Sequence, residues 1–317
     1  MYRDTSIAVV VPCYNEELLI TRVMDTMPDY VDRIYVVDDR SKDRTVEIVE
    51  DYIQQHQPSR VTLIVHEVNQ GVGGAIITGY RRAYSDDMAV VAVMAGDAQM
   101  DPDDLEVIIA PVVAGEADYT KGNRLATGEA WNQIPRVRYL GNVLLSLMTK
   151  IASGYWHIFD SQTGYTAISR KAIATLNWDK LWKRYGYPNH LLIMLNIHNF
   201  AVRDVPVKPV YNVGEKSGIR IWRVIPTISL LLLRGFLTRL FEKFVVRDAH
   251  PLVLFYIVGT LSFIPGFLLG VYLVLYRIVA GPVAPTSALF AMFLIMFGLN
   301  FLMFALWFDM DANRHLR

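Results

Sequence analysis

Short apolar runs alternate with longer segments of helical periodicity through the first half of the chain. The runs are rich in Val and Ile and show no polar alternation, which is typical of strands buried on both faces of a sheet. The predicted strands are 7–11, 31–37, 61–65 and 90–95. The predicted helices between them are 16–27, 45–55 and 74–84. This alternation predicts an α/β fold, with a mainly parallel sheet covered by helices on both faces.

The same alternation continues less regularly toward residue 210. The pattern predicts helices over 102–114 and 137–151, and strands over 118–121, 165–169 and 202–209.

Two long stretches near the C-terminus contain no charged side chain. They run from Pro251 to Tyr276 and from Ile278 to Phe308, with a Gly- and Pro-containing turn at 281–285. Each stretch supplies the ~20 apolar residues that a membrane-spanning helix needs. Core helices of a soluble domain would be shorter and would carry a polar face, which both stretches lack. The pattern therefore predicts a two-helix transmembrane hairpin, at about 251–278 and 287–308.

Apolar and cationic residues interleave in the segment ahead of the hairpin, between 219 and 246. Trp222, the run 230–233 and Phe236 are apolar, while Arg223 and Arg234 interrupt them. This pattern favours amphipathic helices in the membrane interface, with cations toward lipid phosphates. A helix packed on the preceding domain is the alternative. The predicted organisation is a catalytic domain over 1–218, juxtamembrane amphipathic helices over 219–248 and the hairpin over 249–317.

Composition and charge agree with a membrane protein whose larger domain is cytoplasmic. Hydrophobic residues make up 53% of the chain, and the mean hydropathy is +0.26. The N-terminus shows no signal-peptide pattern, and only Arg277 lies near the hairpin turn. The cations that flank the hairpin are Arg234, Arg239, Lys243, Arg247, Arg314 and Arg317. By the positive-inside rule, both ends lie inside, so we expect a multi-pass protein of the cell membrane.

Cysteine content and net charge bear on the cellular compartment and on the kind of partner. The chain has one cysteine, Cys13, which cannot form an internal disulfide and suits a reducing compartment. The formal net charge is +0, so overall charge does not favour nucleic acid as a partner.

Oxygen-bearing side chains follow the predicted strand 90–95. Asp97, Gln99 and Asp101 stand in one short loop after Gly96. Ligands of open α/β sheets bind at the carboxyl ends of the strands. Carboxylate and carboxamide oxygens there suit Mg²⁺ or Mn²⁺, which in turn would hold a diphosphate. The alternative is a solvated loop with an acidic N-cap for the helix that begins near Pro102.

Three other predicted strand ends carry candidate chemistry. Asn15 after the first strand can cap a helix. Asp38 and Asp39 after the second are suited to hydrogen-bonding a ribose hydroxyl or the N–H groups of a base. The loop 69–75 is rich in glycine, but it contains no G-x-G-x-x-G dinucleotide fingerprint, and the chain has no G-x-x-x-x-G-K-[ST] loop. Hydride transfer and P-loop ATP hydrolysis are therefore disfavoured.

In this order and spacing, these segments resemble the family-2 glycosyltransferases of the GT-A fold. Within that family they are similar to the polyprenyl-phosphate glycosyltransferases, of which dolichol-phosphate mannose synthase is one. The resemblance covers essentially the whole chain, including the terminal hairpin. The segments that carry it are 11–17, 37–41, 69–71, 96–99, 122–124 and 160–165.

The resemblance implies a nucleotide-sugar site and a metal site. The implied metal ligands are Asp97, Gln99 and Asp101, although the family normally reads Asp-x-Asp-x-Gln, so the last two are exchanged here. The implied cofactor is Mg²⁺ or Mn²⁺. The implied donor-binding residues are Pro12, Tyr14, Glu16, Asp38, Asp39, Gly71, Asp97 and Ala98.

The resemblance also implies a site for a lipid phosphate. Asp160 and Asp97 are the implied catalytic residues, with Asp160 as the candidate base. Because a phosphate acceptor is already an anion at pH 7, Asp160 can instead orient the acceptor or a sugar hydroxyl; a turn-capping role is the structural alternative. The implied phosphate-binding cations are Arg124, Arg136, Arg138, Lys216 and Arg220. The alternative interpretation of each is an ordinary charged residue on the protein surface.

The function implied by the resemblance is an inverting transfer of a hexose from a UDP- or GDP-sugar to undecaprenyl or dolichyl phosphate. The partners would be the nucleotide sugar, the polyprenyl phosphate and membrane lipids. Two alternatives stay open: a transferase of the same family with another lipid-linked or glycan acceptor, and a noncatalytic membrane partner. Many relatives form homo-oligomers through the membrane region, and the sequence leaves this open.

Overall fold

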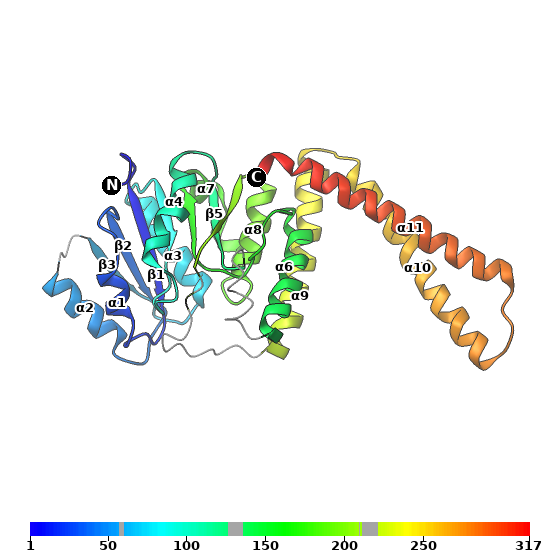
Figure 1. The fold of residues 1–317 in the computed structure, drawn as a ribbon, viewed down its shortest axis with the longest axis horizontal. Helices are drawn as coiled ribbons and strands as arrows, with labels where there is room; N and C mark the ends of the chain where they lie inside the picture. The colour runs from blue at the N-terminus through cyan, green and yellow to red at the C-terminus, as the bar shows by residue number, and fades with distance from the viewer. Residues whose placement is uncertain (57–59, 126–135, 209, 211–220) are drawn as a thin grey trace. The chain divides into compact units, whose positions relative to one another are not determined.

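A seven-stranded mixed sheet forms the centre of the larger of two units in the computed structural model (Figure 1). The structure describes residues 1–56, 60–125, 136–208, 210 and 221–317, with side chains for all of these except 136–140, 142 and 221–225. The first unit comprises Met1–Phe236 with Leu316–Arg317, and the second comprises Leu237–His315.

The strand order brings the loops that carry the predicted site residues to one edge of the sheet. The order is β3-β2-β1-β4-β6-β5-β7, and every neighbouring pair is parallel except the two that involve β6. The carboxyl ends of β1, β2, β4 and β5 therefore meet at one edge, and the segment that enters β6 reaches the same edge. The strands are β1 Ile7–Cys13, β2 Arg33–Asp38, β3 Val61–Val65, β4 Val90–Val93, β5 Tyr119–Asn123, β6 Thr166–Ser169 and β7 Val202–Pro206.

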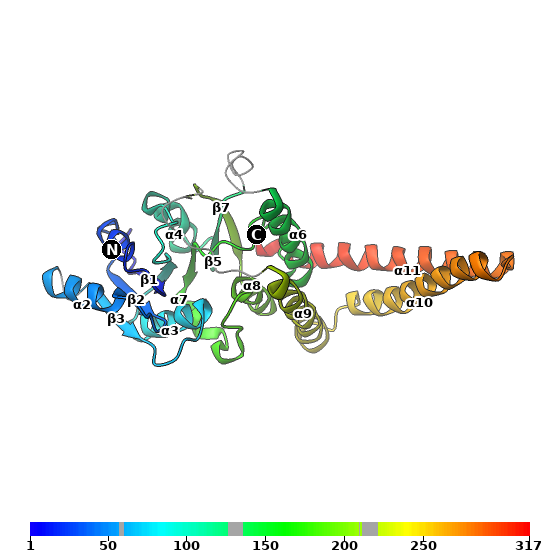
Figure 2. The same cartoon turned by 90° about the horizontal axis from the view of Figure 1, so that it is seen from below.

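Helices cover both faces of this sheet, as Figure 2 shows for α3 and α4. Successive residues of β1 alternate between two hydrophobic cores: Val10 faces the core that contains α3, and Val9 faces the core that contains α4. The helices are α1 Ile20–Asp25, α2 Thr45–Gln55, α3 Val72–Ser85, η1 Pro102–Asp104, α4 Leu105–Val113, α6 Arg136–Ser153, α7 Arg170–Thr175, η2 Trp178–Lys180, α8 Tyr187–Ile197 and α9 Ile221–Arg239.

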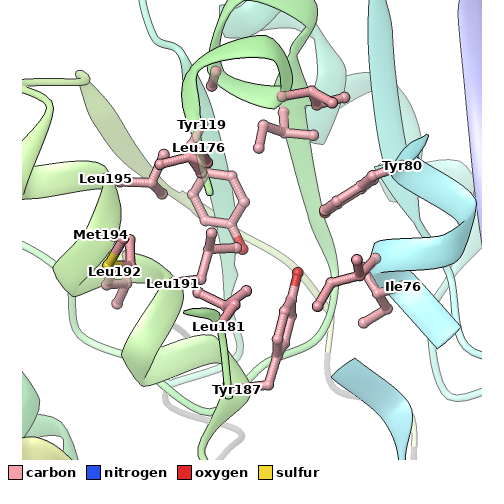
Figure 3. Packing of buried hydrophobic residues seen from close by; sticks show 14 of the residues in the cluster. Ile76, Tyr80, Tyr119, Leu176, Leu181, Tyr187, Leu191, Leu192, Met194 and Leu195 are labelled. Carbon is pink, nitrogen blue, oxygen red and sulfur yellow. The ribbon is translucent and has the colours of Figure 1, made fainter. Parts of the chain in front are cut away.

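The predicted α/β fold is confirmed, with one helix start that was wrong and two helices that were not predicted. Helix α1 begins at Ile20 rather than at Glu16, because the left-handed backbone at Asn15 (φ 59°) and the turn after it precede the helix. Helices α7 and α8 lie where no helix was predicted. Helix α8 has no amphipathic pattern, since nine of its residues are buried. Figure 3 shows its Tyr187 and Leu191 packed toward Tyr80 and Tyr119.

Helix α9 has one face on the domain core and one face exposed. Ile228 and Leu232 are buried in the core that contains α8, whereas Leu230 and Leu233 are 48% and 55% exposed. Both sequence-based interpretations of this segment therefore retain support: it packs on the domain, and it still presents an apolar surface.

The second unit contains two helices long and apolar enough to cross a membrane. They are α10 Leu252–Val279 and α11 Pro285–Ala312, each of 28 residues. Most of their apolar side chains are exposed rather than buried in the protein. A π-helix, η3 Leu240–Arg247, precedes them, and the short helix η4 Arg314–Leu316 follows.

A buried ion pair joins the start of this unit to the end of α11. Arg239 Nη1 and Nη2 donate to Asp309 Oδ1 and Oδ2 at 2.7 and 2.9 Å, and both side chains are fully buried. Lys243 Nζ donates to Asn313 Oδ1 at 2.7 Å one turn further along both helices. Because paired charges satisfy each other away from water, these contacts fix η3 against α11.

Gly298→Ala is expected to open the contact between α10 and α11. A Cβ atom at Gly298 would collide with the backbone nitrogen of Phe263, which cannot move as a side chain can. We expect a loss of about 1–3 kcal/mol, seen as a lower unfolding temperature of the purified chain in detergent. Gly270→Ala is the matched control, because its nearest neighbour, Ile295 Cδ1, would lie 3.6 Å away. Equal unfolding temperatures for the two variants would contradict the packing.

Candidate functional site

Hydrogen bonds tie the loop after β1 to the loop after β2. Asn15 N donates to Ser41 Oγ at 2.9 Å, and Lys42 N donates to Asn15 Oδ1 at 2.7 Å. Glu16 N donates to Thr45 Oγ1 at 2.9 Å. Three residues at this edge have left-handed backbone: Asn15, Arg40 and Ala98, with φ of 59°, 64° and 54°. Such conformations are costly for residues other than glycine, so contacts such as the hydrogen bonds above must hold these loops in place.

Glu16 and Asp97 bring negative charge together at this edge. A Cβ atom at Gly96 would lie 3.5 Å from Glu16 Cγ, so the Glu16 side chain reaches the loop after β4. Burial, followed by the charges of Asp97 and Asp43, raises the pKa of Glu16 to about 7. Crowded carboxylates of this kind favour a bound cation, because positive charge relieves their repulsion.

Asp97 and Asp101, two of the three predicted metal ligands, each accept a hydrogen bond from a backbone N–H two residues further along the chain. Asp97 Oδ1 accepts from Gln99 N at 3.1 Å, and Asp101 Oδ1 accepts from Asp103 N at 3.0 Å. Asp101 thus caps η1, as the alternative interpretation expected, and its Oδ2 lies 3.7 Å from Lys208 Nζ. Within the described parts of the chain, no three His, Cys, Asp or Glu side chains gather in a metal-binding arrangement. The ligand set of Asp97, Gln99 and Asp101 stays a prediction.

The two aspartates at the end of β2, Asp38 within the strand and Asp39 just after it, are buried and accept hydrogen bonds within the protein. Asp38 is 0% exposed and accepts from Ser41 N at 2.9 Å and from the Ser41 hydroxyl. Asp39 is 3% exposed and accepts from Gln70 N at 2.8 Å and Gly71 N at 2.7 Å. Both carboxylates therefore shape the loops that surround the candidate donor site.

Gly71 and the first turn of α3 lie against the segment that precedes α8. Gly71 has φ of 86°, and a Cβ atom there would lie 2.8 Å from Lys183 O and 3.0 Å from Arg184 Cγ. Packing within the protein therefore already requires glycine at this position. Of the remaining predicted donor-binding residues, Pro12 is buried and Tyr14 is 43% exposed.

Arg124 and Asp160 form a buried ion pair where β5 ends and the segment entering β6 begins. Arg124 Nε donates to Asp160 Oδ2 at 2.8 Å and Nη2 to Oδ1 at 3.3 Å. Burial alone would raise the pKa of Asp160, but the guanidinium of Arg124 and the backbone N–H of Gln162 hold that pKa below its ordinary value. Asp160 is 0% exposed, whereas the side chain of Arg124 is 22% exposed. Asp160 therefore holds the side chain of Arg124 in place, and that side chain stays partly exposed.

Sequence reasoning missed two charged residues beside this pair. Lys121 is fully buried, donates to Thr163 O at 2.5 Å, and has its pKa lowered to about 8 by burial. Asp204 Oδ2 accepts from Asn123 Nδ2 at 2.7 Å and Phe159 N at 3.0 Å, while its Oδ1 is buried and has no hydrogen-bond partner among the described residues. Burial raises the pKa of Asp204 to about 6. For Lys121 the available signal was a charge inside an otherwise uncharged strand, whereas Asp204 lies next to Arg203 in β7 and gave no such signal.

The side chains of four predicted phosphate-binding cations lie outside the described part of the structure. Arg136 and Arg138 lie in the first turn of α6, but their side chains fall outside the described part of the structure. Lys216 and Arg220 lie in 211–220, also outside the described residues.

The comparisons with known proteins agree on one family. The sequence profile described as Glycosyl transferase family 2 matches residues 8–176. The chain is 32% identical to the UDP-N-acetylglucosamine–dolichyl-phosphate N-acetylglucosaminyltransferase of Methanococcus voltae, over 66% of this chain and 87% of the relative. It is 27% identical to the polyprenol monophosphomannose synthase of Mycolicibacterium smegmatis, over 73% and 88%.

Solved structures show the same fold. Glucosyl-3-phosphoglycerate synthase from Mycobacterium tuberculosis, in complex with Mn²⁺, UDP and glucosyl-3-phosphoglycerate, matches with a TM-score of 0.52 and 20% identity. The match covers 74% of this chain and 80% of that chain.

Arg124→Ala is expected to cost about 3–5 kcal/mol of stability, because it leaves the buried carboxylate of Asp160 without its cation. Adding Asp160→Asn should recover part of this loss, since the second change removes the unpaired charge. Denaturant unfolding of the two single variants and the double variant measures this coupling. Strictly additive losses would contradict the pairing.

Asp204→Asn is expected to remove a pH dependence of stability. The pKa of Asp204 is raised in the folded state, so its ionisation opposes folding: stability is greatest at low pH and falls as pH rises from about 4 to about 6. The loss is at most about 3 kcal/mol at pH 7. Unfolding free energies of wild type and variant should therefore diverge between about pH 4 and 6, with Asp204→Asn the more stable above that range. The exposed Asp103→Asn should follow wild type.

Proposed function

Because the chain belongs to glycosyl transferase family 2, we propose that it moves a hexose from a UDP- or GDP-linked sugar to a polyprenyl phosphate, either undecaprenyl or dolichyl phosphate. The observation that carries this proposal is the fixed cation of Arg124, held by buried Asp160 at the sheet edge that also bears Glu16 and Asp97. The names of the relatives from M. voltae and M. smegmatis support the acceptor class.

The donor side of the reaction falls to the loops after β1, β2 and β4. Asp97, Gln99 and Asp101 would hold a Mg²⁺ or Mn²⁺ ion, and the raised pKa of Glu16 beside Asp97 fits a cation at this place. When bound, such an ion supplies positive charge for the departing diphosphate. Pro12, Tyr14 and the loops shaped by Asp38 and Asp39 would enclose the nucleoside.

The acceptor side falls to Arg124 and Asp160. A phosphate monoester is already an anion at pH 7, so its oxygen can attack the anomeric carbon without a strong base, with inversion. Asp160 has a lowered pKa and no exposed surface, which makes it a poor base. We therefore assign Asp160 a role that was not considered from the sequence: it orients Arg124 toward the acceptor phosphate. Arg136, Arg138, Lys216 and Arg220 are proposed to add positive charge.

The apolar helices account for how a lipid acceptor would be reached. In this proposal α10 and α11 span the membrane, the domain over 1–218 lies on the cytoplasmic side, and the exposed face of α9 contacts the interface. A water-soluble donor and a membrane-bound acceptor then meet at one surface, which replaces a search in three dimensions by local positioning.

Asp97→Asn is expected to lower sugar transfer at least about 100-fold, because charge stabilisation at the diphosphate would be lost. The assay uses the full chain in detergent with a panel of UDP- and GDP-sugars, undecaprenyl or dolichyl phosphate, and Mn²⁺ or Mg²⁺; labelled glycolipid is counted. The matched control is Asp103→Asn, an exposed acid six residues further along the chain in η1, which should keep wild-type activity. Absence of transfer by wild type with every donor would overturn the proposal.

A further inference from the structure

One carboxylate organises the loop between β3 and α3. We name residues Asn69–Gly71 the donor loop. Asp39 Oδ1 accepts from Gln70 N and Oδ2 accepts from Gly71 N, at 2.8 and 2.7 Å. Asn69 Nδ2 also donates to the backbone oxygen of Asp39 at 2.9 Å. All three residues of the donor loop therefore take their position from Asp39.

A buried histidine holds this carboxylate from the opposite side. His66 Nδ1 lies 2.9 Å from Asp39 Oδ1, and His66 Nε2 lies 2.9 Å from Thr78 Oγ1. Because a carboxylate accepts hydrogen bonds, Nδ1 carries a hydrogen, and in the neutral imidazole Nε2 then accepts from the Thr78 hydroxyl. The backbone of His66 is fixed as well, since its N–H donates to Asp38 O at 2.9 Å. His66 is 7% exposed.

We propose that His66 is a positioning residue for donor binding: it acts through Asp39 to hold the donor loop ready for the nucleoside. This inference rests on the proposed function, because it takes the donor loop to be part of the nucleotide-sugar site. The row Thr78–His66–Asp39–donor loop links α3 to the ends of β2 and β3 through side chains that are buried or partly buried. It also gives Asp39 a role different from direct reading of the base.

Preorganisation explains why such a residue affects binding rather than chemistry. With Asp39 held on both sides, the donor loop is ordered before the donor arrives. Without the bond from His66, Asp39 gains rotational freedom, and the ordering cost moves to the binding step. The loss of one hydrogen bond to a charged group corresponds to a weakening of about tenfold. The acceptor side, built from Arg124 and Asp160, takes no support from this row.

Substitutions of His66 separate its hydrogen bond from its bulk. His66→Phe keeps an aromatic ring but removes both ring nitrogens. His66→Asn places an amide N–H near the position of Nδ1 and so can still donate to Asp39. Thr78→Val removes only the far bond and nearly preserves volume. The control outside the row is His198→Phe, where the histidine contacts Met194 O at the end of α8.

The experiment measures nucleotide binding and steady-state kinetics on the full chain in detergent. UDP and GDP are each titrated by calorimetry with Mn²⁺ present, and KM for donor and acceptor are determined with kcat. For His66→Phe we expect the nucleotide Kd and donor KM to rise about tenfold, with acceptor KM and kcat within about twofold of wild type. His66→Asn should recover most of the affinity, Thr78→Val should show a smaller loss, and His198→Phe should bind as wild type.

Three results would overturn the inference. They are an unchanged nucleotide Kd in His66→Phe and Thr78→Val, an equal loss in His66→Phe and His66→Asn, and a loss of kcat without a change in donor KM. If His66→Phe does not fold, the affinities of Thr78→Val and His66→Asn decide the question. A wild-type chain that transfers sugar while these variants bind normally refutes this inference alone, whereas a wild type inactive with every donor refutes the proposed function as well.

Discussion

The buried carboxylate of Asp160 is the constraint on which the candidate site depends. It has no exposed surface, so its charge must be satisfied by protein groups, and these come from two segments that the sheet brings together. Arg124 approaches from the end of β5, while the backbone N–H groups of Gln162 and Thr163 come from the turn that leads into β6. Removing the cation would strand a buried charge, which is among the costliest changes that a protein tolerates.

The reversed direction of β6 makes this arrangement possible. Since β6 runs antiparallel to β4 and β5, its entry rather than its exit lies beside the carboxyl ends of those strands. The turn that begins at Asp160 therefore faces Arg124 directly. Had β6 been parallel, its preceding loop would lie at the opposite edge. The same edge collects the acids Glu16 and Asp97, so cationic and anionic parts of the site are separated along one row of strand ends.

Much of this arrangement could be predicted from the sequence, and the exceptions have physical causes. Strands β1, β2 and β4 are buried on both faces, so their apolar runs are distinctive. Helix α8 gives no periodic signal because it is buried nearly all round. The roles of Asp39 and Asp204 depend on partners 27 or more residues away, which only the folded chain brings close. A motif can place an aspartate at a strand end, but it does not reveal whether its oxygens face a ligand or a backbone N–H.

Packing between α8 and α9 connects the candidate site to the helix that precedes the apolar hairpin. Gly235 of α9 allows a close approach, since a Cβ atom there would collide with Ile193 Cδ1 of α8. At the start of α8, a Cβ atom at Gly186 would meet Leu231 at 2.9 Å. Helix α8 in turn carries Asn189, whose Oδ1 accepts from Gln162 Nε2 at 2.9 Å, two residues from Asp160. The exposed apolar face of α9 and the turn that holds Arg124 are therefore parts of one packed assembly.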